Sequence, residues 1–298
     1  MERIKEALRG GLPCNSKGYL ESYQENIFQG YMPDRFRNMF MKGSGSELRS
    51  KAEAVHSSSM LAYNFFHWVS DKYPLTIDDI KYTQVFFEVK MEAITTDANM
   101  DILLIDKSRK RLLFIESKFL EYLNSKKYDL KDAYREQDGW KAFLSDVDKI
   151  VPKDNDNSDY QEGIKQGVTH LFALSELKEE KAFKHFNETN GLDLNIKSIQ
   201  DANDIKFINL LFEPNGEYDY DYKRFDNYIR LYRSFKEIAQ QSGIVDDILM
   251  KILTYSELWH IAGEQIKKVN QGHLYQYLEE RYMRFAGMQD NNSVHKIK

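Results

Sequence analysis

Residues 86–118, FFEVKMEAITTDANMDILLIDKSRKRLLFIESK, hold three short apolar segments separated by polar connections. Branched and aromatic side chains dominate each segment, which is typical of β-strands. Together with the residues just beside this stretch, the pattern predicts consecutive strands over Thr83–Met91, Asp101–Asp106 and Arg111–Phe119. Connections this short favour an antiparallel meander.

Two acids and a lysine interrupt the apolar runs of the second and third predicted strands. If the hairpin turn is centred between Ser108 and Arg109, Asp101 lies directly opposite Glu116. Cross-strand partners have Cβ atoms about 4.5 to 5.5 Å apart, and like charges there repel. Side chains alternate along a strand, so Lys118 shares the face of Glu116. Because unpaired charge is costly to bury, the pattern predicts that Asp101 and Glu116 bind a metal ion.

Carboxylates in this arrangement suit Mg²⁺, which prefers oxygen ligands and keeps several waters, and Mn²⁺ is a possible substitute. Bound Mg²⁺ polarises a phosphoryl oxygen and lowers the pKa of an attacking water, while an adjacent ammonium stabilises the developing charge. Asp101, Glu116 and Lys118 are therefore a candidate site for phosphodiester hydrolysis. The alternative is a chance spacing of solvated strand residues.

The remaining chain predicts an α/β fold with a central mixed sheet, in which the antiparallel three-strand meander and a further strand are flanked by helices. Residues 1–45 are expected to have little regular structure. The other expected elements are helices over Glu47–Asp71, Asp129–Val151, Tyr160–Phe186 and Gly263–Phe285, a polar loop over Pro152–Asp159, a strand over Lys206–Phe212, a strand or helix over Met250–Leu258, and a frayed tail from Asp290.

The order of helix, strand with Asp101, and strand with Glu116-Ser117-Lys118 resembles the PD-(D/E)xK nuclease superfamily. Fourteen residues separate the two acids, and Met100 replaces the proline of the motif. The Glu-x-Lys-x-x-Glu pattern ending at Glu121 is similar to a bacterial subgroup of uncharacterised nuclease-like proteins.

The resemblance covers about residues 43–212 and implies a restriction-endonuclease-like core within a single domain, 1–298. Residues 1–42 would be an extension and 213–298 a mainly helical addition. It implies Mg²⁺-dependent hydrolysis of DNA, with Lys118 positioning the water, and leads us to expect a homodimer. Alternatives are an RNA-directed or structure-specific nuclease, and a non-catalytic nucleic-acid-binding protein that retains the fold.

Further site residues follow from the resemblance. The glycine-led segment Gly43-Ser44-Gly45-Ser46 looks like the one that supplies a helix glutamate in resolvase-like members, which makes Glu47 a third acid. The alternative is a capping box of Ser44 and Glu47. Gln166 and His170 resemble the Gln-x-x-x-Tyr motif of the RecB-like branch, with His in place of Tyr, so Gln166 is a candidate substrate contact.

Four flanking residues complete the predicted site. Lys126 and Lys127 follow the third strand closely and are candidates for holding a nucleic-acid backbone. Glu88 in the first strand and Glu121 beyond the third are auxiliary candidates. For these two acids the alternatives are an exposed strand face and a solvated turn.

Composition narrows the class of protein. The 298 residues include 42 basic and 47 acidic ones, giving a formal charge of −5, so any attraction to nucleic acid depends on local clusters. The single Cys14 fits a reducing cytoplasm. We expect neither a membrane span nor a secretory signal. The sequence also lacks the HExxH, GxxxxGK[ST] and GxSxG motifs of other enzyme classes.

Overall fold

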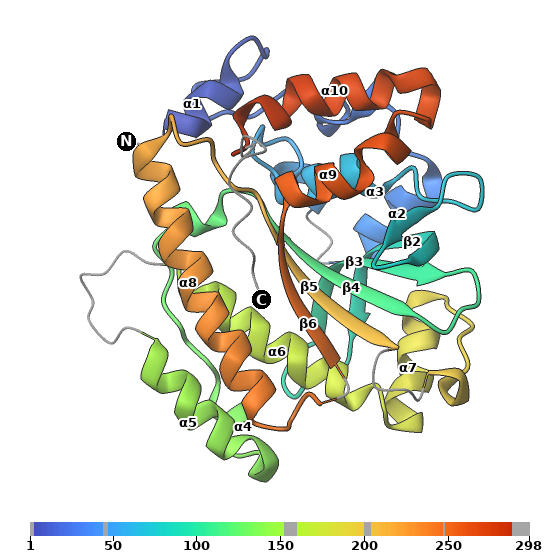
Figure 1. Cartoon of the computed structure of the whole chain (residues 1–298), viewed down its shortest axis with the longest axis vertical. Coiled ribbons are helices and arrows are strands. Elements are labelled where there is room, and N and C mark those ends of the chain that lie inside the picture. Colours follow the sequence, from blue (N-terminus) through green and yellow to red (C-terminus); the bar gives the residue numbers. More distant parts are fainter. Residues whose placement is uncertain (1–2, 44–46, 152–159, 200–203, 247, 288–298) are drawn as a thin grey trace.

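The computed structural model describes residues 3–43, 47–151, 160–199, 204–246 and 248–287. In this part of the chain six strands form one mixed sheet in the order β1-β2-β3-β4-β5-β6 (Figure 1). Neighbouring strands from β1 to β4 pair antiparallel. The pairs β4–β5 and β5–β6 are parallel. The strands are β1 Leu75–Ile77, β2 Ile80–Met91, β3 Ala98–Asp106, β4 Leu112–Lys118, β5 Ile205–Leu211 and β6 Ile248–Thr254.

The predicted α/β class, the meander and the further strand are confirmed. The predicted hairpin register is also correct, because Ile102 lies opposite Ile115 and Leu103 opposite Phe114. Two further strands, β1 and β6, form the edges of the sheet. Strand β1 is only three residues long and left no clear pattern in the sequence. The ambiguous segment Met250–Leu258 contains both structures, with β6 up to Thr254 and helix from Tyr255.

Helices cover both faces of the sheet. They are α1 Arg3–Arg9, α2 Asp34–Lys42, α3 Ser58–Phe66, α4 Asp132–Arg135, α5 Lys141–Ile150, α6 Glu162–Glu176, α7 Glu180–Asn190, α8 Asp219–Gln241, α9 Tyr255–Ile266 and α10 His273–Arg281. In the view of Figure 1, α5, α6 and α8 gather at the left, and α9 and α10 lie above the sheet.

Successive side chains of β4 point to opposite faces of the sheet, and each face is covered by different helices. Phe114 packs on Phe186 of α7, so the face that also carries Glu116 lies against α6 and α7. Ser117 points the other way, and its hydroxyl contacts the Tyr255 hydroxyl of α9 at 2.7 Å. The candidate catalytic side chains therefore lie under α6, at the end of β4.

The N-terminal residues are more regular than predicted. Residues 1–42 include α1 and α2, and Phe36 and Phe40 of α2 pack on Phe87 of the sheet. Their apolar spacing forms a buried helix face once the sheet is present. The expectation of little regular structure was therefore wrong.

The helix predicted over Glu47–Asp71 is interrupted. A π-helix, η3, spans Glu47–Lys51, and α3 begins only at Ser58. The Ser57 side chain accepts a hydrogen bond from the Met60 N–H and caps α3, which fixes the break.

Other predicted helices are also divided. Asp129–Val151 contains α4 and α5, and Tyr160–Phe186 contains α6 and most of α7. Gly263–Phe285 is broken between α9 and α10, where Asn270 and Gln271 have positive φ angles of 47° and 57°. Periodicity alone does not reveal such breaks, because the apolar spacing continues through them. Residues 152–159 and the tail from Asp290 lie outside the described residues.

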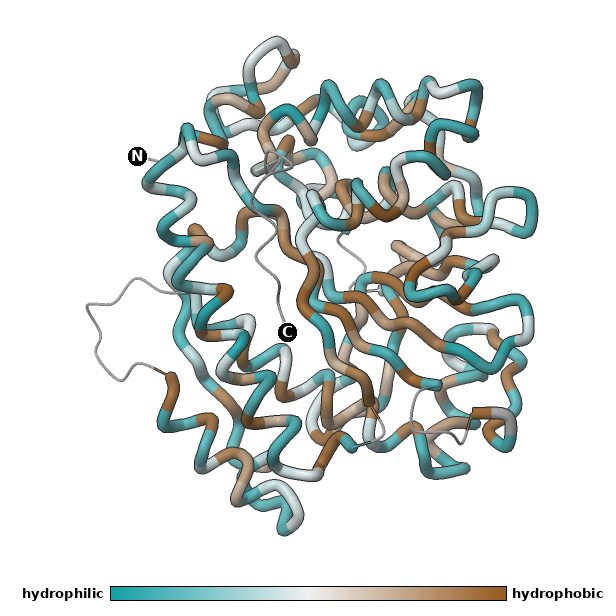
Figure 2. Tube along the Cα trace, in the orientation of Figure 1, coloured by the Kyte–Doolittle hydropathy of each residue, from teal (hydrophilic) through white to brown (hydrophobic). Residues whose placement is uncertain are grey.

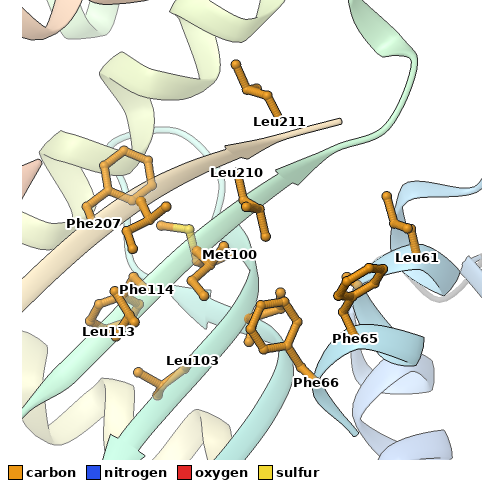
Figure 3. Packing of buried hydrophobic residues seen from close by; sticks show 14 of the residues in the cluster. Leu61, Phe65, Phe66, Met100, Leu103, Leu113, Phe114, Phe207, Leu210 and Leu211 are labelled. Carbon is orange, nitrogen blue, oxygen red and sulfur yellow. The ribbon is translucent and has the colours of Figure 1, made fainter. Parts of the chain in front are cut away.

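The core is one continuous apolar cluster that joins the sheet to its helices. Figure 2 shows the strands as the most continuously hydrophobic part of the chain. In Figure 3, Phe65 and Phe66 of α3 belong to the same cluster as Met100 of β3 and Leu210 of β5. Among the described helices, none has both the length and the apolar character that a membrane crossing requires.

Candidate active site

Three carboxylates form a row across adjacent strands. Glu88 of β2 lies between Phe87 and Val89, whose partners Ile102 and Met100 flank Asp101 on β3. The register between β3 and β4 continues this row to Glu116. Hydrogen bonding between neighbouring strands thus places three acids side by side, as the sequence predicted for Asp101 and Glu116.

Glu116 and Lys118 form a buried ion pair. Their side chains are only 6% exposed each, and the Lys118 ammonium contacts Glu116 Oε1. Burial lowers the pKa of Lys118, but the carboxylates of Glu116 and Asp101 outweigh burial and raise it well above its usual range. Lys118 is therefore an ammonium at neutral pH.

The second oxygen of Glu116 has no hydrogen-bond donor among the described residues. His170 Nε2 lies 3.8 Å from this oxygen. That nitrogen is 3.0 Å from the Asn99 carbonyl and, because a carbonyl only accepts, it carries a proton and donates. Burial lowers the pKa of His170, which favours the neutral ring, and Glu116 Oε2 is left without a hydrogen-bond donor.

Asp101 is held by the backbone of the next strand. The Ser117 N–H donates to Asp101 Oδ2 at 2.7 Å. Burial, and then the charge of Glu116, raise the pKa of Asp101 well above its usual range, although Lys118 opposes them. A bound cation would reverse this effect and favour the ionised carboxylate.

Glu47 reaches the same place from η3. It is buried, and its two oxygens accept from Lys51 Nζ at 2.7 Å and from Ser59 Oγ at 3.2 Å. Glu47 lines one cleft together with Asp101 and Glu116. Ser44, its proposed partner in a capping box, lies outside the described residues.

Glu88 adopts an unusual backbone conformation. Its φ is +51°, in a region that costs non-glycine residues energy and that is often found at functional sites. Burial, and then the charges of Glu47 and Glu116, raise the pKa of Glu88 to about 8. The alternative that Glu88 lies on an exposed strand face is therefore wrong.

The cleft has a volume of about 480 Å³. Its walls carry more negative than positive groups, which adds to the effect of burial on the pKa values of Asp101 and Glu88 and favours binding of a cation. Six carboxylates, Glu47, Glu88, Asp101, Glu116, Glu121 and Glu162, line it together with four lysines, Lys5, Lys51, Lys118 and Lys126.

The remaining predicted residues divide into two groups. Gln166 and Lys126 line the cleft, where Gln166 Oε1 accepts from the Tyr160 hydroxyl at 3.4 Å and Lys126 pairs with Glu162 at 2.6 Å. Glu121 also lines it, and its carboxylate accepts from the Phe119 N–H at 2.7 Å. Lys127 is not part of the cleft wall.

Several residues of the cleft escaped prediction. Lys5 and Tyr19 come from the N-terminal 42 residues, for which the sequence gave no functional signal. Asn209 of β5 does not line the cleft but lies in register with Glu116 and extends the polar row, and its interruption of an apolar run was the available sign. Nothing comparable marked Lys5 or Tyr19, because only the fold brings them to the site.

The donor set fits a divalent cation held by few protein ligands. No group of three His, Cys, Asp or Glu side chains in the described ranges is arranged as a complete metal centre. Asp101 and Glu116, however, are adjacent carboxylates in an acidic cleft, and Glu116 Oε2 has no hydrogen-bond donor among the described residues. Mg²⁺ commonly binds through one or two carboxylates and completes its shell with water and substrate phosphate.

The mixed sheet flanked by helices is compatible with the core of restriction-endonuclease-like proteins. Residues 2–283 match the family model described as restriction endonuclease associating with ARP, so the chain belongs to this family. The match extends well beyond residues 43–212, on which the resemblance rests. No curated protein and no solved structure gives a significant match.

Proposed function

We propose that the protein is a Mg²⁺-dependent endonuclease that hydrolyses DNA phosphodiester bonds at Asp101, Glu116 and Lys118. The observation that carries the proposal is a buried, charged lysine beside two carboxylates from adjacent strands, all three in one cleft. Membership of a restriction-endonuclease family supports a nuclease with a nucleic-acid substrate.

Asp101 and Glu116 would hold the metal ion. Bound there, Mg²⁺ would polarise a phosphoryl oxygen and lower the pKa of the attacking water. The ammonium of Lys118, kept charged by Glu116, would orient that water and stabilise the negative charge of the transition state. Glu47 would support the metal as a further acid, and Glu88 and Glu121 would have auxiliary roles.

The substrate backbone would lie along the lysines of the cleft. Gln166 and Lys126 are placed to contact it, and Lys127 would contact the backbone outside the cleft. Because the cleft is rich in carboxylates, the cation would also remove the repulsion that a phosphodiester otherwise meets there. Two copies of the chain would cut the two strands of a duplex.

The decisive experiment incubates the protein with plasmid DNA, DNA oligonucleotides and RNA, in Mg²⁺, Mn²⁺ or EDTA. We expect cleavage of DNA with either metal and none in EDTA. Replacing Asp101 by Asn keeps the shape of the side chain but removes its charge, and should slow cleavage at least about 100-fold.

The matched control is Asp97→Asn, because Asp97 is exposed, precedes the same strand and does not line the cleft. This variant should cut like the unmodified protein. If Asp101→Asn cuts as fast as Asp97→Asn, the assignment of the site is wrong. Preferential cleavage of RNA would change the substrate but not the site.

A non-catalytic nucleic-acid-binding protein is the second candidate, and the contact of the Lys118 ammonium with Glu116, which occupies both groups, is the observation that favours it. Metal titration separates the two candidates. An enzyme should gain thermal stability from Mg²⁺ or Mn²⁺ through Asp101 and Glu116, and the gain should disappear in Asp101→Asn. A binder should show no such gain.

A further inference from the structure

Four residues near the N-terminus line the cleft. Lys5 of α1 and Tyr19 lie in the extension before the nuclease-like core, and Lys51 of η3 and His56 lie at the start of the core; we call these four residues the N-terminal wall. These residues line the same cleft as Asp101, Glu116 and Lys118. The N-terminal wall therefore meets whatever molecule reaches the catalytic residues.

Tyr19 is fixed by its backbone. It forms a β-bridge with Ala54, and its N–H donates to Asn15 Oδ1 at 3.1 Å. On either side, the Leu20 N–H donates to the Glu53 carbonyl and the Val55 N–H to the Gly18 carbonyl. The backbone that carries the ring is thus anchored at three consecutive residues.

The ring of Tyr19 is nevertheless accessible, because the residue is 36% exposed. Tyr160, which also lines the cleft, is only 3% exposed and its hydroxyl is bound to Gln166. An anchored, accessible aromatic ring loses little conformational freedom when a flat partner stacks on it. Tyr19 is therefore the better platform for a ligand.

Charge on the N-terminal wall fits a phosphodiester backbone. Lys5 and Lys51 line the same cleft as Tyr19, and the Lys51 carbonyl accepts from the N–H of Ala54, the bridge partner of Tyr19. Proteins that bind single-stranded nucleic acid combine basic groups along the backbone with aromatic rings on which bases stack. A cleft of about 480 Å³ is the size of a small-molecule site and admits a short strand segment rather than a whole duplex.

We infer that Tyr19 stacks on an unpaired nucleobase next to the scissile phosphate. The preferred substrate would then be a nucleic acid whose cleaved strand is single-stranded, frayed or unpaired at the cut. This inference rests on the proposed function for its catalytic part, whereas stacking itself is measurable without cleavage.

The test compares Tyr19→Ala, Tyr19→Phe and Tyr31→Ala. Tyr31 is a suitable control because it is 70% exposed and does not line the cleft. Binding of fluorescein-labelled single-stranded and fully paired DNA is measured by anisotropy, with Ca²⁺ in place of Mg²⁺. The change from Tyr19 to Ala should weaken binding of the single strand about 5- to 150-fold.

Tyr19→Phe should bind within about twofold of the unmodified protein, because it keeps the ring, and so should Tyr31→Ala. In a cleavage assay Tyr19→Ala should raise KM much more than it lowers kcat. A single strand of RNA should show the same loss, since every base has a stacking face.

Unchanged binding by Tyr19→Ala, or an equal loss on fully paired DNA, would overturn the inference while leaving the proposed nuclease intact. Conversely, a protein that cuts no nucleic acid but loses single-strand binding in Tyr19→Ala would refute the nuclease and support stacking. Thermal unfolding of each variant confirms that the fold is retained.

Discussion

The two ends of the central sheet differ in how their charged side chains are paired. At one end each charge has partners of opposite sign, and at the other end carboxylates are in excess. At the end where β4 begins, Asp78 accepts from Lys206 at 3.1 Å and from Lys251 at 2.5 Å. These lysines outweigh burial and lower the pKa of Asp78. At the end where β4 finishes, burial, and then the neighbouring carboxylates, raise the pKa of Asp101 and Glu88 instead.

This difference indicates that the charged residues around Asp78 serve to stabilise the fold. Around Asp78 each charge has opposite partners, as structural ion pairs do. Around Asp101 and Glu116 the negative groups exceed the positive ones, which destabilises the folded chain unless a cation binds. Proteins keep such costly arrangements mainly where function needs them.

Replacing Lys118 by Met is expected to have the largest effect on stability. It leaves the Glu116 carboxylate buried without its cation, and the free energy of unfolding should fall by about 3 kcal/mol in EDTA. Denaturant unfolding measures the change. The double variant Glu116→Gln, Lys118→Met should recover most of it; equal losses in both proteins would contradict this reading of the pair.

Replacing Glu88 by Gln should stabilise the metal-free protein at pH 8. The pKa of Glu88 is raised from 4.5 to about 8. Between these pH values the folded state holds a proton that the unfolded chain has lost, so stability falls as pH rises. The neutral variant escapes this loss and should gain about 1 to 3 kcal/mol at pH 8.

Thermal unfolding in EDTA from pH 4 to pH 9 tests this expectation. The two proteins should differ little in stability near pH 4, where Glu88 of the unmodified protein is largely protonated in the folded and in the unfolded state. Their stabilities should diverge as the pH rises. A variant that is less stable than the unmodified protein at pH 8 would show that the Glu88 carboxyl stabilises the site rather than straining it.

Lys251→Met at the other end of the sheet should have the smallest effect. The Lys251 side chain is 34% exposed, and Asp78 retains Lys206. We expect a loss of about 0.5 to 1 kcal/mol in denaturant unfolding, smaller at high salt because water and ions screen the pair. A loss as large as that of Lys118→Met would remove the contrast between the two ends.

Local patterns were sufficient for the centre of the fold. Alternation of apolar residues located β2, β3 and β4, and the short turn after Asp106 fixed the register that aligns Asp101 with Glu116. The helix breaks after Lys51 and before His273 were missed, because a cap or a positive φ interrupts a helix without changing its apolar spacing.

The sequence by itself determined the strand meander, its register and the close approach of Asp101, Glu116 and Lys118, since all three depend on neighbours along the chain or on one hairpin. Only the tertiary structure decided that Glu47 and Tyr19 line the same cleft, and that Glu88 is buried. The reason is physical: packing of α1, η3 and α6 around the sheet end sets these distances and the desolvation that shifts the pKa values.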